Sequence, residues 1–166
     1  IEDGDEVLAT PLTCTASNWP IVANNLKIKW VDIDPTTLNM DLEDLERKMT
    51  PKTKAIMGVH WGGYPLDLDE IRNIRARFRK EHGWAPALIE DGAHSIGTKY
   101  KGKYLGNHGN FVMNSLQAIK HITSVDGGLL YCPHDELYER AKLLRWYGID
   151  RSPKGRTDFR CEADIE

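Results

Sequence analysis

Short apolar runs alternate with longer amphipathic runs along this chain, and this alternation is the feature that most constrains its fold. Six apolar runs are typical of strands, at 6–10, 28–33, 55–60, 87–91, 110–115 and 127–132. Four amphipathic stretches predict helices, at 15–26, 41–49, 68–83 and 135–148. Because a helix between two strands carries the chain back to the same edge of a sheet, we predict an α/β fold with a mostly parallel sheet.

The link between the last two predicted strands is too short for a parallel crossover. Eleven residues without a helical period separate Ser115 from Gly127, and a parallel return needs a dozen or more. We therefore expect the strand at 127–132 to run antiparallel to at least one neighbour. Residues 99–109 are rich in glycine and predict a turn or a small hairpin.

Composition bounds the classes of function. Of the 166 residues, 40% are hydrophobic and 28% are charged, which is typical of a soluble globular domain with a sizeable core. The formal net charge is −3 and no basic block stands out. We therefore expect neither a nucleic acid polymer nor a membrane surface as the main partner. No apolar run approaches the roughly 18 residues that span a bilayer.

The cysteines and the ends of the chain give three further expectations. Cys14, Cys132 and Cys161 are far apart and odd in number, which favours neither a disulfide framework nor a metal motif and indicates a reducing cytoplasm. The acidic opening lacks a methionine, so we expect the chain to have been cut from a longer protein. We assign 1–150 to one domain and expect the polar stretch 151–166 to be a loop or a stub.

Four residues that could carry chemistry follow the ends of predicted strands. Asp91 ends the strand at 87–91, His94 comes three residues later, and Ser115 ends the strand at 110–115. Lys120 follows in the next loop among apolar neighbours. Ligands of open α/β sheets bind at the carboxyl ends of the strands. A lysine amine becomes a nucleophile when desolvation or a nearby cation removes its proton. The sequence therefore predicts a lysine-centred site at this edge.

Each of these residues also has a structural interpretation. Lys120 could extend its ammonium to solvent from an apolar loop, Asp91 could cap the next segment, and His94 could be a hydrogen-bonded core residue. Ser115 alone carries little information. Zinc could be considered for His60, Asp91 and His94, but their spacing matches no strong metal pattern, so we predict no metal site. From the residues alone these alternatives stay open.

Four stretches of the sequence, together covering most of residues 1–150, resemble the DegT/DnrJ/StrS-type aminotransferases. They are GDEVLATPLTCTASNWPI, VDIDPTTLNMDLEDLERKMTPKTKAIMGVHWGGYPLDLDEI, LIEDGAHSIGTKYKGKYLGNHGNF and NSLQAIKHITSVDGG. The resemblance implies a fold-type-I, aspartate-aminotransferase-like large domain with three layers, α/β/α, and one antiparallel strand. It also implies pyridoxal 5'-phosphate as the cofactor and a nucleotide-linked keto sugar as the substrate.

The resemblance implies a role for each of the four site residues. Lys120 matches the lysine that forms the Schiff base with the cofactor and moves a proton on the substrate. Asp91 matches the acid that pairs with the pyridine nitrogen, and a carboxylate there favours the protonated ring. His94 matches a position near the ring oxygen, and Ser115 matches the serine that bonds the cofactor phosphate. The implied reaction is ping-pong, with glutamate as the expected amino donor.

The sequence departs from the family pattern at several positions. The family usually has glycine where Val125 stands and aspartate where Asn110 stands, and an aromatic ring that stacks on the cofactor where Cys14 stands. The serine is usually flanked by phenylalanines, whereas Asn114 and Leu116 flank it here.

The resemblance also implies parts that these 166 residues do not include. They are an N-terminal segment that helps to bind the phosphate, a small C-terminal domain, and an asparagine from the partner subunit of a homodimer. We expect the 166 residues alone to bind the cofactor weakly and to be inactive.

Two alternatives remain within the same resemblance. Some relatives are dehydratases of the same sugars and carry histidine where the Schiff-base lysine would stand, so Lys120 favours transamination. A non-catalytic regulatory relative could keep the scaffold, but a scaffold needs none of the four site residues.

Overall fold

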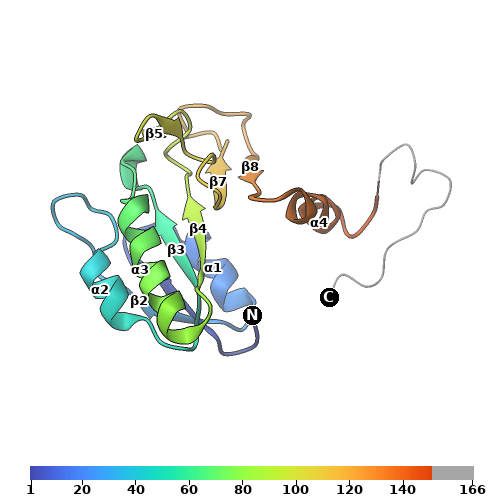
Figure 1. The fold of residues 1–166 in the computed structure, drawn as a ribbon. Helices are drawn as coiled ribbons and strands as arrows, with labels where there is room; N and C mark the ends of the chain where they lie inside the picture. Colours follow the sequence, from blue (N-terminus) through green and yellow to red (C-terminus); the bar gives the residue numbers. More distant parts are fainter. Residues whose placement is uncertain (151–166) are drawn as a thin grey trace.

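A six-stranded sheet forms the centre of the molecule in the computed structural model, which describes residues 1–150 (Figure 1). Its strands lie in the order β2 (Lys27–Trp30), β1 (Glu6–Ala9), β3 (Thr53–Val59), β4 (Ala87–Asp91), β7 (Phe111–Ser115) and β8 (Gly128–Tyr131). The first five are parallel, and β8 pairs antiparallel with β7. The predicted mostly parallel sheet and its antiparallel strand are confirmed.

Helices cover both faces of the sheet, so the predicted three layers are also confirmed. Figure 1 shows α2 (Leu42–Lys48) and α3 (Leu68–His82) on one face and α1 (Thr15–Ala23) on the other. Side chains alternate between the faces along each strand, which divides the core in two. Leu8, Ile56 and Leu88 pack with residues of α2 and α3. The other cluster contains Val7, Ala9, Ile21, Ala55 and Met57, where Ile21 belongs to α1.

The helix ends follow from side chains that satisfy free backbone groups. The Asp67 side chain accepts hydrogen bonds from the N–H groups of Asp69 and Glu70 at the start of α3, and Asp41 caps α2 in the same way. α3 ends at His82 and is capped by Gly83, whose φ of 80° suits glycine. The predicted helix at 15–26 ends earlier, at Ala23, since Asn25 takes a left-handed conformation with φ of 56°.

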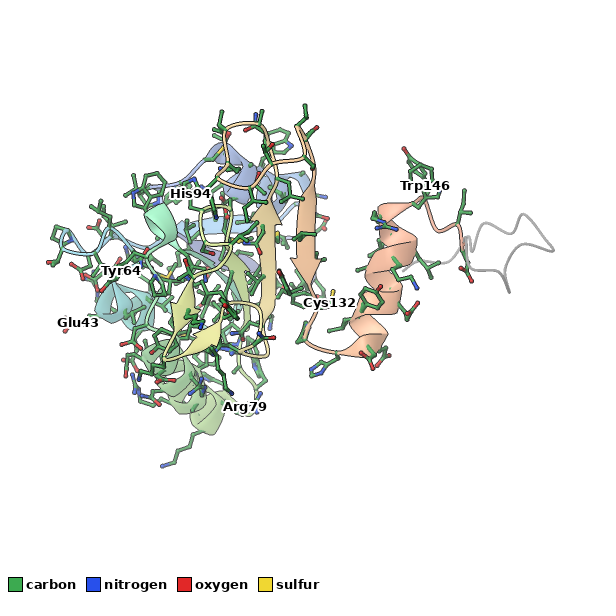
Figure 2. The ribbon with its side chains drawn as sticks, turned by 90° about the horizontal axis from the view of Figure 1, so that it is seen from above. Glu43, Tyr64, Arg79, His94, Cys132 and Trp146 are labelled. Carbon is green, nitrogen blue, oxygen red and sulfur yellow. The ribbon has the colours of Figure 1, made fainter. Side chains whose placement is uncertain are left out.

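Two elements lie outside the layers. Residues 99–109 contain the hairpin of β5 (Lys99–Tyr100) and β6 (Lys103–Tyr104), as expected. Helix α4 (Asp135–Arg145) lies beyond β8, at the side of the sheet rather than over a face (Figures 1 and 2). None of the helices in residues 1–150 combines the length and the apolar character of a membrane span. The expected loop or stub at 151–166 lies outside the described residues.

Candidate active site

The carboxyl ends of the parallel strands meet at one edge of the sheet, and all four predicted site residues lie there. Asp91 is the last residue of β4 and Ser115 the last of β7. His94 lies in the loop after β4, and Lys120 lies in the loop that leads from β7 to β8. His94 is labelled in Figure 2.

The carboxylate of Asp91 is held on both oxygens. Its Oδ1 accepts a hydrogen bond of 2.9 Å from the N–H of Ala93. Its Oδ2 accepts one from the hydroxyl of Ser17, a residue of α1 that is only 2% exposed. The Ser17 hydroxyl also lies 2.7 Å from that of Thr13. Asp91 therefore presents a carboxylate of fixed orientation on the α1 side of the sheet.

Ser17 is a site residue that sequence reasoning missed. It stands 74 positions from Asp91 in the chain, and no motif marks it. The signal that could have found it is topological. α1 begins just after the carboxyl end of β1, so its first turn must lie at the same edge as Asp91.

His94 lies at the surface of this edge, so the interpretation as a core histidine is wrong. Its ring meets the edge of the Trp61 ring, with the centroids 5.6 Å apart. Trp61 opens the short 3-10 helix η1 (Trp61–Gly63) directly after β3. A Cβ at Gly63 would lie 2.8 Å from the carbonyl oxygen of His94, so only glycine allows this close approach. The turn after β3 thus supports the loop that carries His94.

The loop of Lys120 packs against the loop of His94. The ring nitrogen Nε2 of His121 lies 3.0 Å from the carbonyl oxygen of Ile96, which joins the two loops directly. The backbone N–H of Lys120 donates to the carbonyl of Gln117 at 2.9 Å. The side chain of Lys120 is partly buried, and within residues 1–150 its ammonium has no recorded hydrogen bond or ion pair. The Ser115 hydroxyl accepts a hydrogen bond of 3.3 Å from the N–H of Gln117.

The structure also shows the surroundings of three positions that depart from the pattern of the resembling family. Val125 lies in the Lys120 loop with φ of 72°, a left-handed conformation that is costly for a β-branched residue. Asn110 donates a hydrogen bond of 2.6 Å to Glu90. Cys14 is exposed and directly precedes α1. An aromatic ring does lie at this edge, that of Trp61 beside His94.

His60, one of the three residues for which zinc could be considered, is fully buried and uses both ring nitrogens within the protein. Nε2 lies 2.8 Å from Glu90, and Nδ1 accepts a hydrogen bond from the N–H of Leu66. Among the described residues no group of three candidate ligands is arranged to hold a metal ion.

Comparison with known proteins shows which family the sequence matches. A model described as the DegT/DnrJ/EryC1/StrS aminotransferase family matches residues 1–161. The chain is 55% identical to AtS13 from Actinomadura melliaura, with a TM-score of 0.90 over 95% of this chain and 43% of that one. It is 47% identical to the sugar aminotransferase CalS13 from Micromonospora echinospora, with a TM-score of 0.88 and the same coverage.

Three more proteins resemble this chain at lower sequence identity. An uncharacterized protein of Methanocaldococcus jannaschii is 40% identical over 91% of this chain, which spans 38% of that relative's length. The putative sugar aminotransferase Spr1654 from Streptococcus pneumoniae, 27% identical with a TM-score of 0.84, was solved in its PMP form and also in a PLP form. A GDP-4-keto-6-deoxy-D-mannose-3-dehydratase from E. coli with bound hydrated PLP is 30% identical, with a TM-score of 0.80 over 90% of this chain and 37% of that one.

Proposed function

Because the chain belongs to the DegT/DnrJ/EryC1/StrS aminotransferase family, we propose that the whole protein is a sugar aminotransferase. It takes an amino group from an amino acid, for which we propose glutamate, and gives it to a nucleotide-linked keto sugar. The cofactor is pyridoxal 5'-phosphate. The observation that carries the proposal is the presence of Lys120 in a loop packed against the loop of His94, at the edge that also holds Asp91 and Ser115.

The residues present at this edge fit the cofactor. A pyridoxal phosphate offers a ring nitrogen that takes a proton, an aldehyde that takes an amine, and a phosphate that takes hydrogen-bond donors. The edge offers the carboxylate of Asp91, the amine of Lys120 and the hydroxyl of Ser115. The carboxylate is fixed by two donors, and the amine has no recorded partner within residues 1–150. These are the chemical groups that such a cofactor needs, and they come from the ends of two adjacent strands, β4 and β7, and from the loop after β7.

Each residue has a defined task in the proposed reaction. When bound, the cofactor would supply an electron sink for the negative charge that develops on the substrate carbon. Asp91 would hold a proton on the ring nitrogen, and Ser17 and the N–H of Ala93 would keep its carboxylate in place. The Lys120 amine would hold the cofactor at its aldehyde carbon and, once the amine of the amino acid displaces it there, would take up and return the proton of the substrate carbon. His94 would orient the ring at its oxygen substituent, and Ser115 would donate to the phosphate.

The proposal also covers the partners and the compartment. We propose a homodimer in the cytoplasm, with the nucleotide sugar and the amino acid as its small-molecule partners. We propose that 1–150 act as the large cofactor-binding domain and that 151–166 lead toward a small domain.

A dehydratase of the same fold is the second candidate, since one such enzyme is among the similar structures. The residue at position 120 favours transamination, because related dehydratases carry histidine there whereas this chain has lysine. The product distinguishes the two functions: amino transfer gives an amino sugar, and dehydration gives a deoxy sugar.

The test is the Lys120→Ala variant of the whole protein. Amino transfer from glutamate to a 4-keto nucleotide sugar should fall by at least about 10²-fold, the low end of what a positioned acid–base group contributes. Lys103→Ala is the matched control, because Lys103 is an exposed lysine in the β5–β6 hairpin, and it should keep full activity. Undiminished transfer by Lys120→Ala would refute the assignment, and a deoxy sugar as wild-type product would favour the dehydratase.

A further inference from the structure

A pair of ionisable side chains is buried next to the candidate site, one residue from Asp91. Glu90 precedes Asp91 in β4 and is 0% exposed, as is His60, which follows the end of β3. The two side chains meet at 2.8 Å between Nε2 and Oε2. Buried carboxylates are rare in proteins because losing water costs several kcal/mol, and replacing such a pair by apolar residues often costs no stability. Stability alone therefore gives no reason for this pair.

The hydrogen bonds fix the state of the His60 ring. Its Nδ1 accepts the N–H of Leu66 at 3.0 Å, so Nδ1 carries no proton. The ring proton lies on Nε2 and points at Glu90. The other oxygen of Glu90 accepts the side-chain amide of Asn110 at 2.6 Å. Both oxygens of Glu90 thus act as acceptors, each for a neutral donor, and the three side chains have one mutually consistent arrangement.

This cluster is tied to the site through the backbone. The N–H of His60 donates to the carbonyl of Asp91 at 3.0 Å, while its ring bonds the neighbouring Glu90. The next residue, Trp61, packs its ring against His94. His60 therefore fixes the end of β3 relative to the end of β4. At that point Asp91 ends its strand and the loop that carries His94 begins.

Glu90 itself points away from the candidate site. Leu88, two residues earlier, packs in the core on the α3 side, whereas Ile89 packs on the α1 side. Alternation along the strand places Glu90 with Leu88 and Asp91 with Ile89, and the bond from Ser17 in α1 agrees. Glu90 and the Asp91 carboxylate thus lie on opposite faces of the sheet.

We propose that His60, Glu90 and Asn110 are positioning residues that hold the Asp91 carboxylate and the His94 loop in the geometry that binds the cofactor. The proposal rests on the proposed function for the identity of that cofactor. The backbone register between β3 and β4 transmits the effect. The turn after β3 begins at His60, whose N–H bonds the carbonyl of Asp91, and the loop after β4 carries His94, whose ring meets that of Trp61.

The test uses Glu90→Gln in the whole protein, which keeps the size of the side chain and removes its second acceptor oxygen. The first measurement is hydrogen exchange of the Ala93 amide without cofactor, because this N–H donates to Asp91 Oδ1. The exchange of the Ala93 amide should become about tenfold faster in Glu90→Gln. The Kd for pyridoxal 5'-phosphate should also rise about tenfold, which corresponds to about 1.4 kcal/mol of lost binding free energy. Ile56→Val is the control, a similarly buried change in β3 without a polar contact, and should leave both within twofold.

Two outcomes would overturn the proposal. One is that Glu90→Gln leaves both the Ala93 exchange and the Kd within twofold of the wild type. The other is a different ring state of His60: long-range proton–nitrogen NMR of the wild type should find the proton on Nε2 alone, and a proton on Nδ1 would refute the arrangement. This measurement also decides the matter if Glu90→Gln does not fold. If the wild type binds no pyridoxal 5'-phosphate, the proposed function fails, whereas the Ala93 exchange still tests the positioning.

Discussion

The hydroxyl of Ser17 should be worth about 2 kcal/mol of folding stability because it bonds a carboxylate in a partly buried place. Hydrogen bonds to charged groups contribute about 1.5–3 kcal/mol, against about 0.5–1.5 kcal/mol for neutral pairs. In Ser17→Ala the Oδ2 of Asp91 loses the hydroxyl and keeps no other recorded protein donor within residues 1–150. The Thr13 hydroxyl, which also bonds Ser17, is only partly buried and can bond water instead. The loss of the Thr13–Ser17 bond should therefore add little to the destabilisation.

A double-mutant cycle in urea measures this contribution. Ser17→Ala alone should lower the free energy of unfolding by about 2 kcal/mol. In the Asp91→Asn background the acceptor is neutral, so the same substitution should cost only about 1 kcal/mol, which leaves a coupling of about 1 kcal/mol. Thr13→Ala is the control and should cost less than about 0.5 kcal/mol. Equal costs of Ser17→Ala in the two backgrounds would show that Ser17 does not stabilise the charge of Asp91.

Two further predictions concern stability. In Gly92→Ala the new Cβ would lie 2.6 Å from Asn114 Nδ2 and 3.0 Å from the Met113 carbonyl oxygen, so urea denaturation should show a loss of about 1–3 kcal/mol. Gly58→Ala should cost less because its closest contact is the flexible end of Leu66, and the reverse order would contradict the packing. Burial acts to raise the pKa of Asp44, but the N–H of Asp32 and the cations of Lys48 and Arg47 outweigh it and lower the pKa to about 2. Asp44 should therefore add about 2 kcal/mol above pH 4 that is lost as the pH falls toward 2; a stability difference between wild type and Asp44→Asn that is the same at pH 7 and pH 2 would refute this.

The fold was predictable because local signals and chain length agree. The period of α3 places Ile71, Ile74 and Phe78 on one face, and all three are buried. The short link after Ser115 excluded a parallel return, and β8 is antiparallel. Strand and helix ends were less predictable, since they depend on single residues. The expected strand at 28–33 ends at Trp30, where the chain turns to place the N–H of Asp32 against the side chain of Asp44.

The candidate site was predictable only in part. Asp91 and Ser115 end strands, so the pattern of the sheet is enough to place them at one edge. Ser17 and Trp61 were not found, because their contacts join segments that are far apart in the chain and follow no period. The pattern of apolar and polar residues also does not reveal the backbone conformation of Val125. Its positive φ gives a physical reason why glycine is usual at this position in the resembling family.

Asp91 and Lys120 differ in how firmly the protein holds them, and the difference matches their proposed roles. The Asp91 carboxylate has a donor on each oxygen, and its backbone carbonyl accepts from the N–H of His60. A group that must keep one charge and one orientation throughout a reaction gains from such fixed surroundings. The ammonium of Lys120 has no recorded partner within residues 1–150, and its loop carries the strained Val125. A group that must exchange bonds with an aldehyde and a substrate carbon would lose reactivity if a carboxylate held it, so the same edge needs both a fixed acid and an uncommitted amine.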